Sequence, residues 1–204
     1  FPHLLQYSDV RDVGKAAKDW PQLNFVIYHS GWRWTGPNAP KSAWEHFEKT
    51  GRIEWVTDLA DIPGKYGVKN VYGDLGQLFA WTTTANPRLG AAVMGTLIKG
   101  LGSSNVVWGT DAVWTGAPQW QIEALRRLEI PEEMQKKYGY KPLGAADGAV
   151  KNAIFGGNNA RLYNVTPKQQ AAIIVDRVAA IKETYEQHGP GRTNMAYGYA
   201  AKKT

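Results

Sequence analysis

Short apolar runs alternate with longer stretches of helical periodicity along the chain, and this alternation limits the possible folds more than any other feature. Three runs rich in β-branched and aromatic residues have the length of buried strands: residues 23–28, 68–72 and 105–108. Strands that alternate with helices are typical of right-handed βαβ units built around a parallel sheet. The sequence therefore predicts an α/β fold with about three parallel strands and flanking helices.

Helices are predicted between and after these runs from apolar spacing and from start and stop signals. Ser8 is placed to cap the first helix, and the segment TPKQ at 166–169 forms a capping box with proline at the first position of the last helix. The predicted helices cover residues 8–20, 42–49, 52–62, 87–100, 119–128, 131–138, 145–154 and 167–187. Because no internal repeat or low-complexity tract interrupts the chain, we expect a single domain over residues 1–204.

A parallel sheet with helices outside it is either a closed barrel or a doubly wound open sheet. The open sheet would carry a glycine-rich phosphate-binding turn directly after a strand. The glycine pair at 156–157 follows a predicted helix instead. The barrel is therefore favoured, and three strands out of eight would make the chain a portion of a TIM-type (β/α)8 barrel.

Polar side chains follow all three predicted strands, at the sheet edge where barrel enzymes carry their active sites. His29 follows the first strand, Asp74 the second and Asp111 the third. Neutral imidazole and carboxylate groups are natural ligands for a divalent metal ion and natural acid–base partners for its water. Either His29 or Asp111 alone is more often a structural residue, but their matching positions favour a shared site. Asp74 is more readily interpreted as a turn carboxylate.

Residues in the loops after the same strands are candidates for substrate binding. Trp32 and Trp114 follow His29 and Asp111. Aromatic walls suit an organic, ring-containing substrate, and they suit the core of a loop equally well. Arg33 is placed either to pair with an anionic group of a substrate or to be a surface charge. The expected ligand is therefore a small organic molecule.

Composition excludes several other classes of protein. The net charge of +6 is scattered and forms no basic stripe with interleaved aromatics, so we expect no nucleic-acid partner. The sequence contains no run of about 18 apolar residues, so no membrane span is predicted. The absence of cysteine excludes disulfides, thiolate metal sites and a cysteine nucleophile. The chain begins at Phe1 without a signal segment, so we expect a processed or fragmentary chain, and the sequence assigns no compartment.

Four segments in fixed order resemble the second half of proteins in family 2 of the amidohydrolase superfamily. They are NFVIYHSG, NVYGDLG, NVVWGTDAVW and AIFGGNNARLY. This family includes aminocarboxymuconate-semialdehyde decarboxylase and many metal-dependent hydrolases. The resemblance runs from about residue 9 to residue 165, and its most specific part is GTD after an apolar strand combined with the terminal GGN-x-ARLY.

That resemblance implies a (β/α)8 barrel that binds one or two divalent metal ions, with the three predicted strands as strands six to eight. His29 then corresponds to a histidine that orients or activates the attacking water or binds a second metal ion. Asp111 corresponds to an aspartate that ligates the metal, expected to be zinc, and takes a proton from its water. Asn158 corresponds to the cap of a short helix, and Arg161 to a structural contact.

The chain departs from the family in lacking a His-x-His pair and strands one to five. Two ligands are too few for a catalytic zinc site, which usually has three protein ligands. We therefore expect an incomplete metal-dependent hydrolase that attacks an ester, lactone or amide once the missing N-terminal half is supplied. A non-oxidative decarboxylase and a catalytically inactive half-barrel are the alternatives. The unpaired sheet edges predict a homo-oligomer or a covering partner segment.

Overall fold

Three short parallel strands form the central sheet of the computed structural model, which describes residues 7–33, 39–169 and 179–187. The strands are β1 (Phe25–Ile27), β2 (Val71–Asp74) and β3 (Val106–Val107), hydrogen-bonded in the order β1-β2-β3. Ile27 aligns with Gly73, and Gly73 aligns with Val106, so the three strands end at nearly the same level. The predicted α/β fold with three parallel strands is confirmed.

Helices and helical turns occupy much of the remaining chain. In chain order they are α1 (Val13–Asp19), the 3-10 turn η2 (Tyr28–Gly31), α2 (Ala39–Thr50), α3 (Val56–Tyr66), α4 (Gly76–Ala85), α5 (Pro87–Leu101), the 3-10 turn η3 (Ser103–Asn105), α6 (Ala112–Thr115), α7 (Gln119–Arg127), α8 (Glu132–Tyr138), α9 (Ala149–Asn152), the π-helical turn η4 (Ala153–Gly157), α10 (Asn158–Leu162) and α12 (Ala179–Gln187). The chain divides into two units, residues 1–164 and 165–204. The expectation of a single domain over residues 1–204 stays a prediction.

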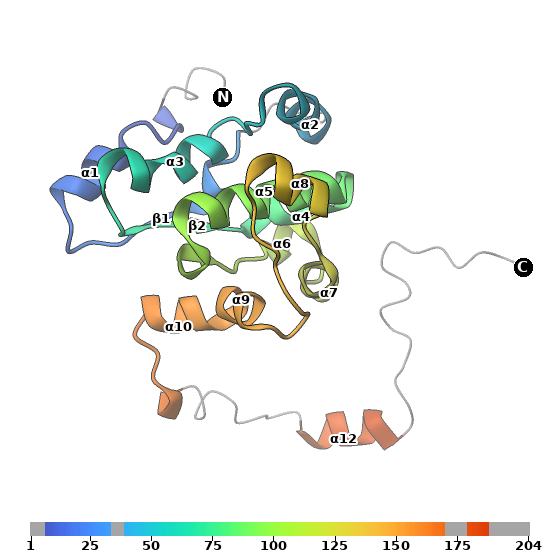
Figure 1. Ribbon diagram of the computed structural model, residues 1–204. Helices are drawn as coiled ribbons and strands as arrows, with labels where there is room; N and C mark the ends of the chain where they lie inside the picture. The colour runs from blue at the N-terminus through green and yellow to red at the C-terminus, as the bar shows by residue number, and fades with distance from the viewer. Residues whose placement is uncertain (1–6, 34–38, 170–178, 188–204) are drawn as a thin grey trace, which may run out of the picture. The chain divides into compact units, whose positions relative to one another are not determined.

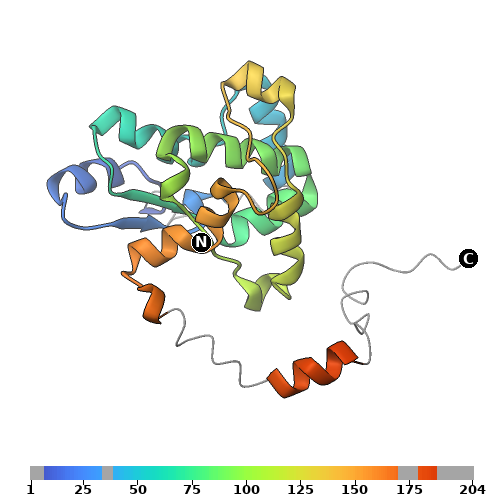
Figure 2. The ribbon, with the colours of Figure 1, turned by 60° about the horizontal axis from the view of Figure 1, so that its bottom comes forward.

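Helices cover both faces of the sheet. Figure 1 shows α1, α3 and α5 on one side of β1 and β2 and α9 and α10 on the other, and Figure 2 shows the same layers from a second direction. The backbones of α3 and α5 approach closely, because a Cβ on Gly100 would lie 2.1 Å from the carbonyl oxygen of Ala60. Leu59, Val71 and Leu97 are fully buried in the core that these elements share.

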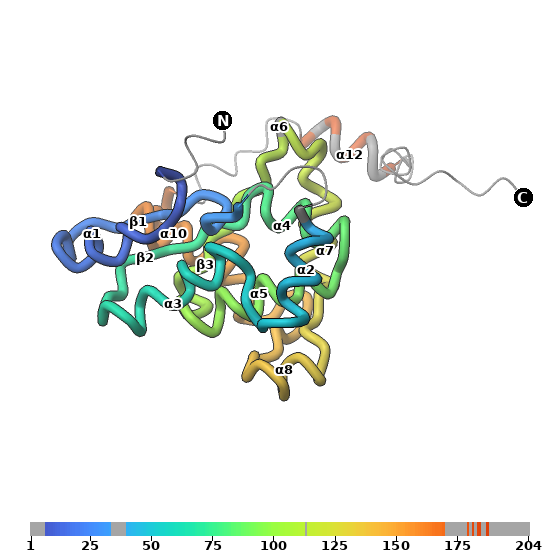
Figure 3. Tube along the Cα trace, turned by 90° about the horizontal axis from the view of Figure 1, so that it is seen from above, coloured from blue at the N-terminus to red at the C-terminus, as the bar shows by residue number. Residues whose placement is uncertain are grey.

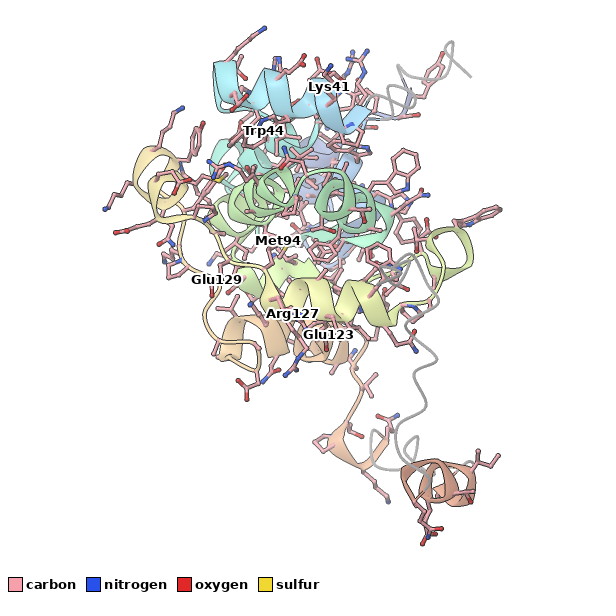
Figure 4. All side chains as sticks on the ribbon, turned by 90° about the vertical axis from the view of Figure 1, so that its right-hand side faces the viewer. Lys41, Trp44, Met94, Glu123, Arg127 and Glu129 are labelled. Carbon is pink, nitrogen blue, oxygen red and sulfur yellow. The ribbon has the colours of Figure 1, made fainter. Side chains whose placement is uncertain are left out.

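The helices combine buried or partly buried anchors with exposed ion pairs. Trp44 of α2 packs against the guanidinium of Arg88, 5.7 Å from its ring centroid, and Met94 of α5 is fully buried (Figure 4). Glu123 and Arg127 form an ion pair of 3.2 Å along α7, and both side chains are exposed. Exposed pairs of this kind contribute little stability, so the packing of side chains such as Met94 and Trp44 contributes more to holding the helices in place.

Several helix boundaries differ from the predicted ones. α1 begins at Val13, so Ser8 does not cap it. α3 begins at Val56 because a turn precedes it, in which Thr57 Oγ1 accepts the Ile53 N–H at 2.8 Å. Helix α4 was not predicted at all, and it follows β2 directly. The helix predicted over residues 145–154 forms only as the short α9 and η4.

Asparagine side chains bind backbone carbonyl groups near the amino end of the sheet. Three amides each donate to two or three carbonyl oxygens at 2.7–3.2 Å: Asn70 to Ala17, Trp20 and Leu23; Asn105 to Lys69 and Val71; Asn158 to Ser103 and Val106. Asn158 therefore ties α10 to β3 instead of capping a helix, which corrects the role implied by the family resemblance. Arg161 makes the expected structural contacts, to Asn158 Oδ1 at 3.3 Å and to the Ser104 carbonyl oxygen.

The second unit begins with the predicted capping box. The Thr166 N–H donates to Gln169 Oε1 at 2.8 Å, and the Gln169 N–H donates to Thr166 Oγ1 at 3.2 Å. Residues 167–169 and α12 are helical as predicted for 167–187, while 170–178 lie outside the described residues. In the described part of the chain, no helix has the length and apolar character needed to cross a bilayer.

Candidate active site

His29 leaves the sheet at the carboxyl end of β1, within the turn η2. The φ angles of His29 and Ser30 are 52° and 48°, in the left-handed region that residues other than glycine rarely adopt. Two contacts with β2 hold this turn. The Ser30 hydroxyl donates to the Asp74 carbonyl oxygen at 2.8 Å, and the His29 backbone N–H donates to the Asp74 carboxylate at 3.2 Å. The turn is therefore fixed to the middle strand of the sheet.

Asp111 lies between β3 and α6, and its φ of 52° is also left-handed. It occupies the N-cap position of α6 without a side-chain capping bond, so its carboxylate has no capping role. Gln121 of α7 holds the loop from within the core. Its buried amide donates to the Thr110 carbonyl oxygen at 2.8 Å and to the Thr115 hydroxyl at 2.7 Å. The Gln121 side chain thus holds the loop that carries Asp111 without engaging the Asp111 carboxylate.

The His29 and Asp111 side chains approach each other at the carboxyl end of the sheet. His29 Nε2 lies 3.8 Å from Asp111 Oδ2, and the two side chains are 30% and 28% exposed. Because β1 and β3 both pair with β2 and not with each other, these side chains reach across the middle strand. Figure 3 shows α4 and α6, the helices that follow β2 and β3, and these two helices are in contact. The convergence of His29 and Asp111 was predicted, while their catalytic roles stay predictions.

Helix α4 determines where the proton of the neutral His29 ring resides. The Gln77 N–H donates to His29 Nδ1 at 3.1 Å. Gln77 is in the first turn of α4, whose N–H groups have no partner within the helix, and the N-cap residue Leu75 supplies no side-chain acceptor. The imidazole therefore caps α4. Since Nδ1 is the acceptor, the proton of the neutral ring is on Nε2, the nitrogen that faces Asp111.

Asp74 lies against His29 at the site, although the sequence favoured a turn carboxylate over a pocket residue. It is the last residue of β2, and its partly buried carboxylate accepts the His29 N–H. Burial raises the pKa of Asp74 above its ordinary value; the hydrogen bond and charge of His29 lower that pKa, and the charge of Asp111 raises it further. The one signal that marks Asp74 in the sequence is its position at the end of the middle strand.

Two glycines leave room for these contacts. A Cβ on Gly76 would lie 2.4 Å from His29 Nδ1 and 2.8 Å from Asp74 Oδ2. A Cβ on Gly109 would lie 2.3 Å from Asp74 Oδ1. Atoms do not approach this closely without displacement, so any other residue at either position would move the imidazole or the carboxylate. The His29 ring and the Asp74 carboxylate are therefore packed directly against backbone.

The three predicted substrate-binding residues have different surroundings. Trp32 is 5% exposed and belongs to the hydrophobic core, which favours the loop-core interpretation, and its contact with a substrate stays a prediction. Arg33 forms an ion pair with Glu54 at 2.7 Å and lies over the Trp55 ring, which gives its charge a partner within the chain. Trp114 is 77% exposed on α6, three residues after Asp111, and its contact with a substrate stays a prediction.

The residues present fit a metal ion only in part. The Asp111 carboxylate is accessible and has the chemistry of a ligand. His29 does not fit as a ligand in this arrangement, because Nδ1 accepts from Gln77 and Nε2 carries the proton. Across residues 7–33, 39–169 and 179–187, no three His, Asp or Glu side chains are grouped to hold an ion. The predicted zinc site formed by His29 and Asp111 together is therefore not complete.

Two cavities lie apart from this site. One of about 920 Å³ is bordered by α3 and by the last turns of α2, α5 and α8, and one of about 480 Å³ lies near the start of α1 and beside α3. Neither is lined by His29, Asp74 or Asp111. The helix ends around the larger cavity carry Lys49, Lys99 and Lys137 in their last turns, where positive charge stabilises a helix. Helix stability is thus a sufficient reason for these lysines.

Comparison with known proteins gives one family match and one structural match. The sequence model of a family described as amidohydrolase matches residues 2–165. The crystal structure of 5-carboxyvanillate decarboxylase LigW from Sphingomonas paucimobilis is similar to this chain with a TM-score of 0.39 and 20% sequence identity. That alignment covers 74% of this chain and 36% of the decarboxylase, so the chain spans about a third of the length of that enzyme. A comparison with curated protein sequences finds no match.

Proposed function

Since the chain belongs to the amidohydrolase family, whose members typically use a divalent metal ion, we propose that it carries the His29–Asp111 part of a hydrolytic active site. The substrate would be a small organic ester, lactone or amide. The observation that carries the proposal is the 3.8 Å approach of His29 Nε2 to Asp111 Oδ2 at the carboxyl end of a parallel sheet. The three strands would be part of a (β/α)8 barrel.

His29 and Asp111 have opposite hydrogen-bonding capacities, and this suits them to opposite sides of a hydrolytic step. The neutral His29 ring presents Nε2–H, a donor, because Gln77 occupies Nδ1. A donor at this place would stabilise the oxygen that gains negative charge when the carbonyl group is attacked. The Asp111 carboxylate presents an acceptor, which would take the proton of the attacking water. His29 is thus better suited to oxyanion stabilisation than to the role of base.

Asp111 is the residue of this chain that would hold a metal ion. When bound, a divalent metal ion, which we propose to be zinc, supplies a water nucleophile of lowered pKa and polarises the carbonyl group under attack. The remaining ligands would come from a second copy of the chain, so the purified chain would supply all of them. Trp114 would contribute an apolar wall for the organic part of the substrate.

The proposal is tested by measuring bound metal and hydrolysis together. The purified chain, alone and with added Zn²⁺, would be examined by elemental analysis and with a panel of aryl esters, lactones and amides. We expect zinc binding that falls at least tenfold in Asp111→Asn and is retained in His29→Gln, because Asp111 fits as a ligand and His29 does not. Asp147→Asn is the matched control, since Asp147 is an exposed carboxylate in the segment between α8 and α9.

The products separate hydrolysis from its alternatives. Release of an alcohol or amine together with a new carboxylic acid supports hydrolysis. Release of carbon dioxide from an aromatic acid in the same panel would replace it with non-oxidative decarboxylation. Absence of zinc binding and of any turnover would overturn the proposal and would support a catalytically inactive half-barrel.

A further inference from the structure

We infer that Asp74 is a positioning residue, which holds the His29 ring in the Nε2–H form that faces Asp111. Its consequence for catalysis rests on the function proposed above. Its structural content rests on contacts within this chain alone, all of them at the carboxyl end of β2.

The first contact is between Asp74 and the backbone of His29. The Asp74 carboxylate accepts the His29 N–H at 3.2 Å, and the Asp74 carbonyl oxygen accepts the Ser30 hydroxyl at 2.8 Å. His29 and Ser30 are both left-handed, a conformation that persists only where surrounding contacts enforce it. Asp74 makes both of these contacts, one through its side chain and one through its backbone. Without its carboxylate, the unfavourable backbone of His29 would lose one of the two bonds that fix it.

The second contact is between the Asp74 carboxylate and the backbone that also packs against the His29 ring. A side chain at Gly76 would collide with both His29 Nδ1 and Asp74 Oδ2, so the ring and the carboxylate lie against one point of the backbone. Gly109 leaves space for the other carboxylate oxygen, Asp74 Oδ1. The carboxylate is thereby enclosed between the loops after β2 and β3. A shift of Asp74 would move the ring relative to α4.

The position of the His29 ring determines which of its nitrogens carries the proton. The ring stays in the Nε2–H form as long as Nδ1 accepts the Gln77 N–H at 3.1 Å. If the η2 turn relaxes and Nδ1 withdraws, Gln77 returns to the unsatisfied state of a first-turn N–H group. The ring is then free to carry its proton on either nitrogen. The Asp74 carboxylate therefore acts on the site through the backbone of His29, without contact with the reacting atoms.

The test uses NMR of the full chain and needs neither metal nor substrate. Long-range ¹H–¹⁵N spectra report which nitrogen of each imidazole carries the proton, and the chain has four histidines, so a His29→Gln variant assigns the signal. Amide exchange reports the Gln77 N–H. In Asp74→Ala we expect a loss of the pure Nε2–H signature and at least about tenfold faster exchange at Gln77. In Asp74→Asn the amide oxygen still accepts the His29 N–H, so both readouts should match the unchanged chain.

The control distinguishes positioning from general loss of stability. Asn105→Ala removes side-chain bonds of 2.9 and 3.0 Å at the amino end of the sheet, so it should speed amide exchange without a preference for Gln77. An unchanged ring signal and unchanged Gln77 exchange in Asp74→Ala would overturn the inference. If Asp74→Ala does not fold, Asp74→Asn decides, and a mixed ring signal in that variant would overturn it. A failure of zinc binding or hydrolysis would count against the proposed function and would leave these readouts intact.

Discussion

His29, Ser30 and Asp111 share a backbone conformation that ordinary residues avoid. Their φ angles lie between 48° and 52°, and each such residue costs on the order of 1 kcal/mol or more. Side-chain hydrogen bonds offset this cost. Asp74 binds the loop that carries His29, and Gln121 binds the loop that carries Asp111. Strain of this kind concentrates at functional sites. At the scale of single residues, the carboxyl end of the sheet therefore has the features of an active site.

Gly109→Ala should show how tightly this end of the sheet is packed. The added methyl group would lie 2.3 Å from Asp74 Oδ1, so the carboxylate or the loop must shift. We expect a loss of about 1–3 kcal/mol in the free energy of unfolding, measured by urea denaturation. Gly64→Ala is the control, because a methyl group there meets no atom within 4 Å and should stabilise α3 by up to about 1 kcal/mol. Equal stability of the unchanged chain and the Gly109 variant would contradict this packing.

Sequence alone was sufficient to place His29 and Asp111 but not the residues that support them. Both follow strand-forming runs, and parallel strands bring their carboxyl ends to one edge, so pattern and topology together predict the convergence. Asp74 follows the middle run in the same way, but its bond to the His29 backbone depends on a left-handed turn that no local pattern specifies. For Trp32 the sequence could not decide between a substrate-binding wall and a loop core, because its burial depends on the packing of distant helices.

At the scale of elements, helices with local caps were predictable and helices with distant caps were not. α5 begins at Pro87, as predicted, and the Asn86 side chain before it accepts the Arg88 N–H at 3.0 Å. α4 has no such local signal, because its first turn is capped by the His29 ring from 48 residues earlier in the chain. A terminus that takes its acceptor from another element cannot be located by inspection of its own residues.

The end of α7 depends in the same way on a distant side chain. Lys151 is 1% exposed, and its Nζ donates to the carbonyl oxygens of Arg126 and Leu128 at 2.8 and 2.9 Å. Lys151→Met should leave both carbonyl groups unsatisfied and lower the free energy of unfolding by about 2–4 kcal/mol, measured by urea denaturation. Lys136→Met is the control, because Lys136 is exposed and pairs only with Glu132, and its effect should stay within about 0.5 kcal/mol. A Lys151 variant as stable as that control would contradict the role.

Lys151 should also make stability depend on pH in the alkaline range. Burial lowers the pKa of Lys151 below its ordinary value of 10.5. Between the lowered pKa and 10.5 the unfolded chain binds more protons at this residue than the folded chain, so the free energy of unfolding rises with pH. The stability difference between the unchanged chain and Lys151→Met should therefore widen as pH increases towards 10.5. A stability difference that narrows over this range would contradict a lowered pKa of Lys151.

At the scale of the whole molecule, β1 and β3 are the outer strands of the sheet. In the described residues, β1 and β3 each pair only with β2. The parallel order itself was predictable, because the alternation of strands and helices allows few arrangements. The lengths of the strands were not, since β1 has three residues where six were expected and is only partly buried at its edge position. Membership of the barrel as strands six to eight stays a prediction.

We propose that these edges are covered by a second copy of the chain. Unpaired strand edges favour association, so the mass in solution should exceed the 22.6 kDa of one chain. Size-exclusion chromatography with light scattering gives this mass directly. Phe25→Lys would place a charge on the outer strand β1 and should shift the population towards the monomer. A stable monomer for the unchanged chain at every concentration would contradict self-association.

The amino end of the sheet is held by the side-chain amides of Asn70, Asn105 and Asn158, and the carboxyl end carries the candidate site. Their hydrogen bonds lie at the amino end of the sheet, whereas His29 and Asp111 follow the carboxyl ends of β1 and β3. The alignment of the strands is thus supported by groups other than the His29 and Asp111 side chains. The loops at the carboxyl end, which are held by Asp74 and Gln121, can therefore change the site when they are altered while the amino end keeps the strands in register.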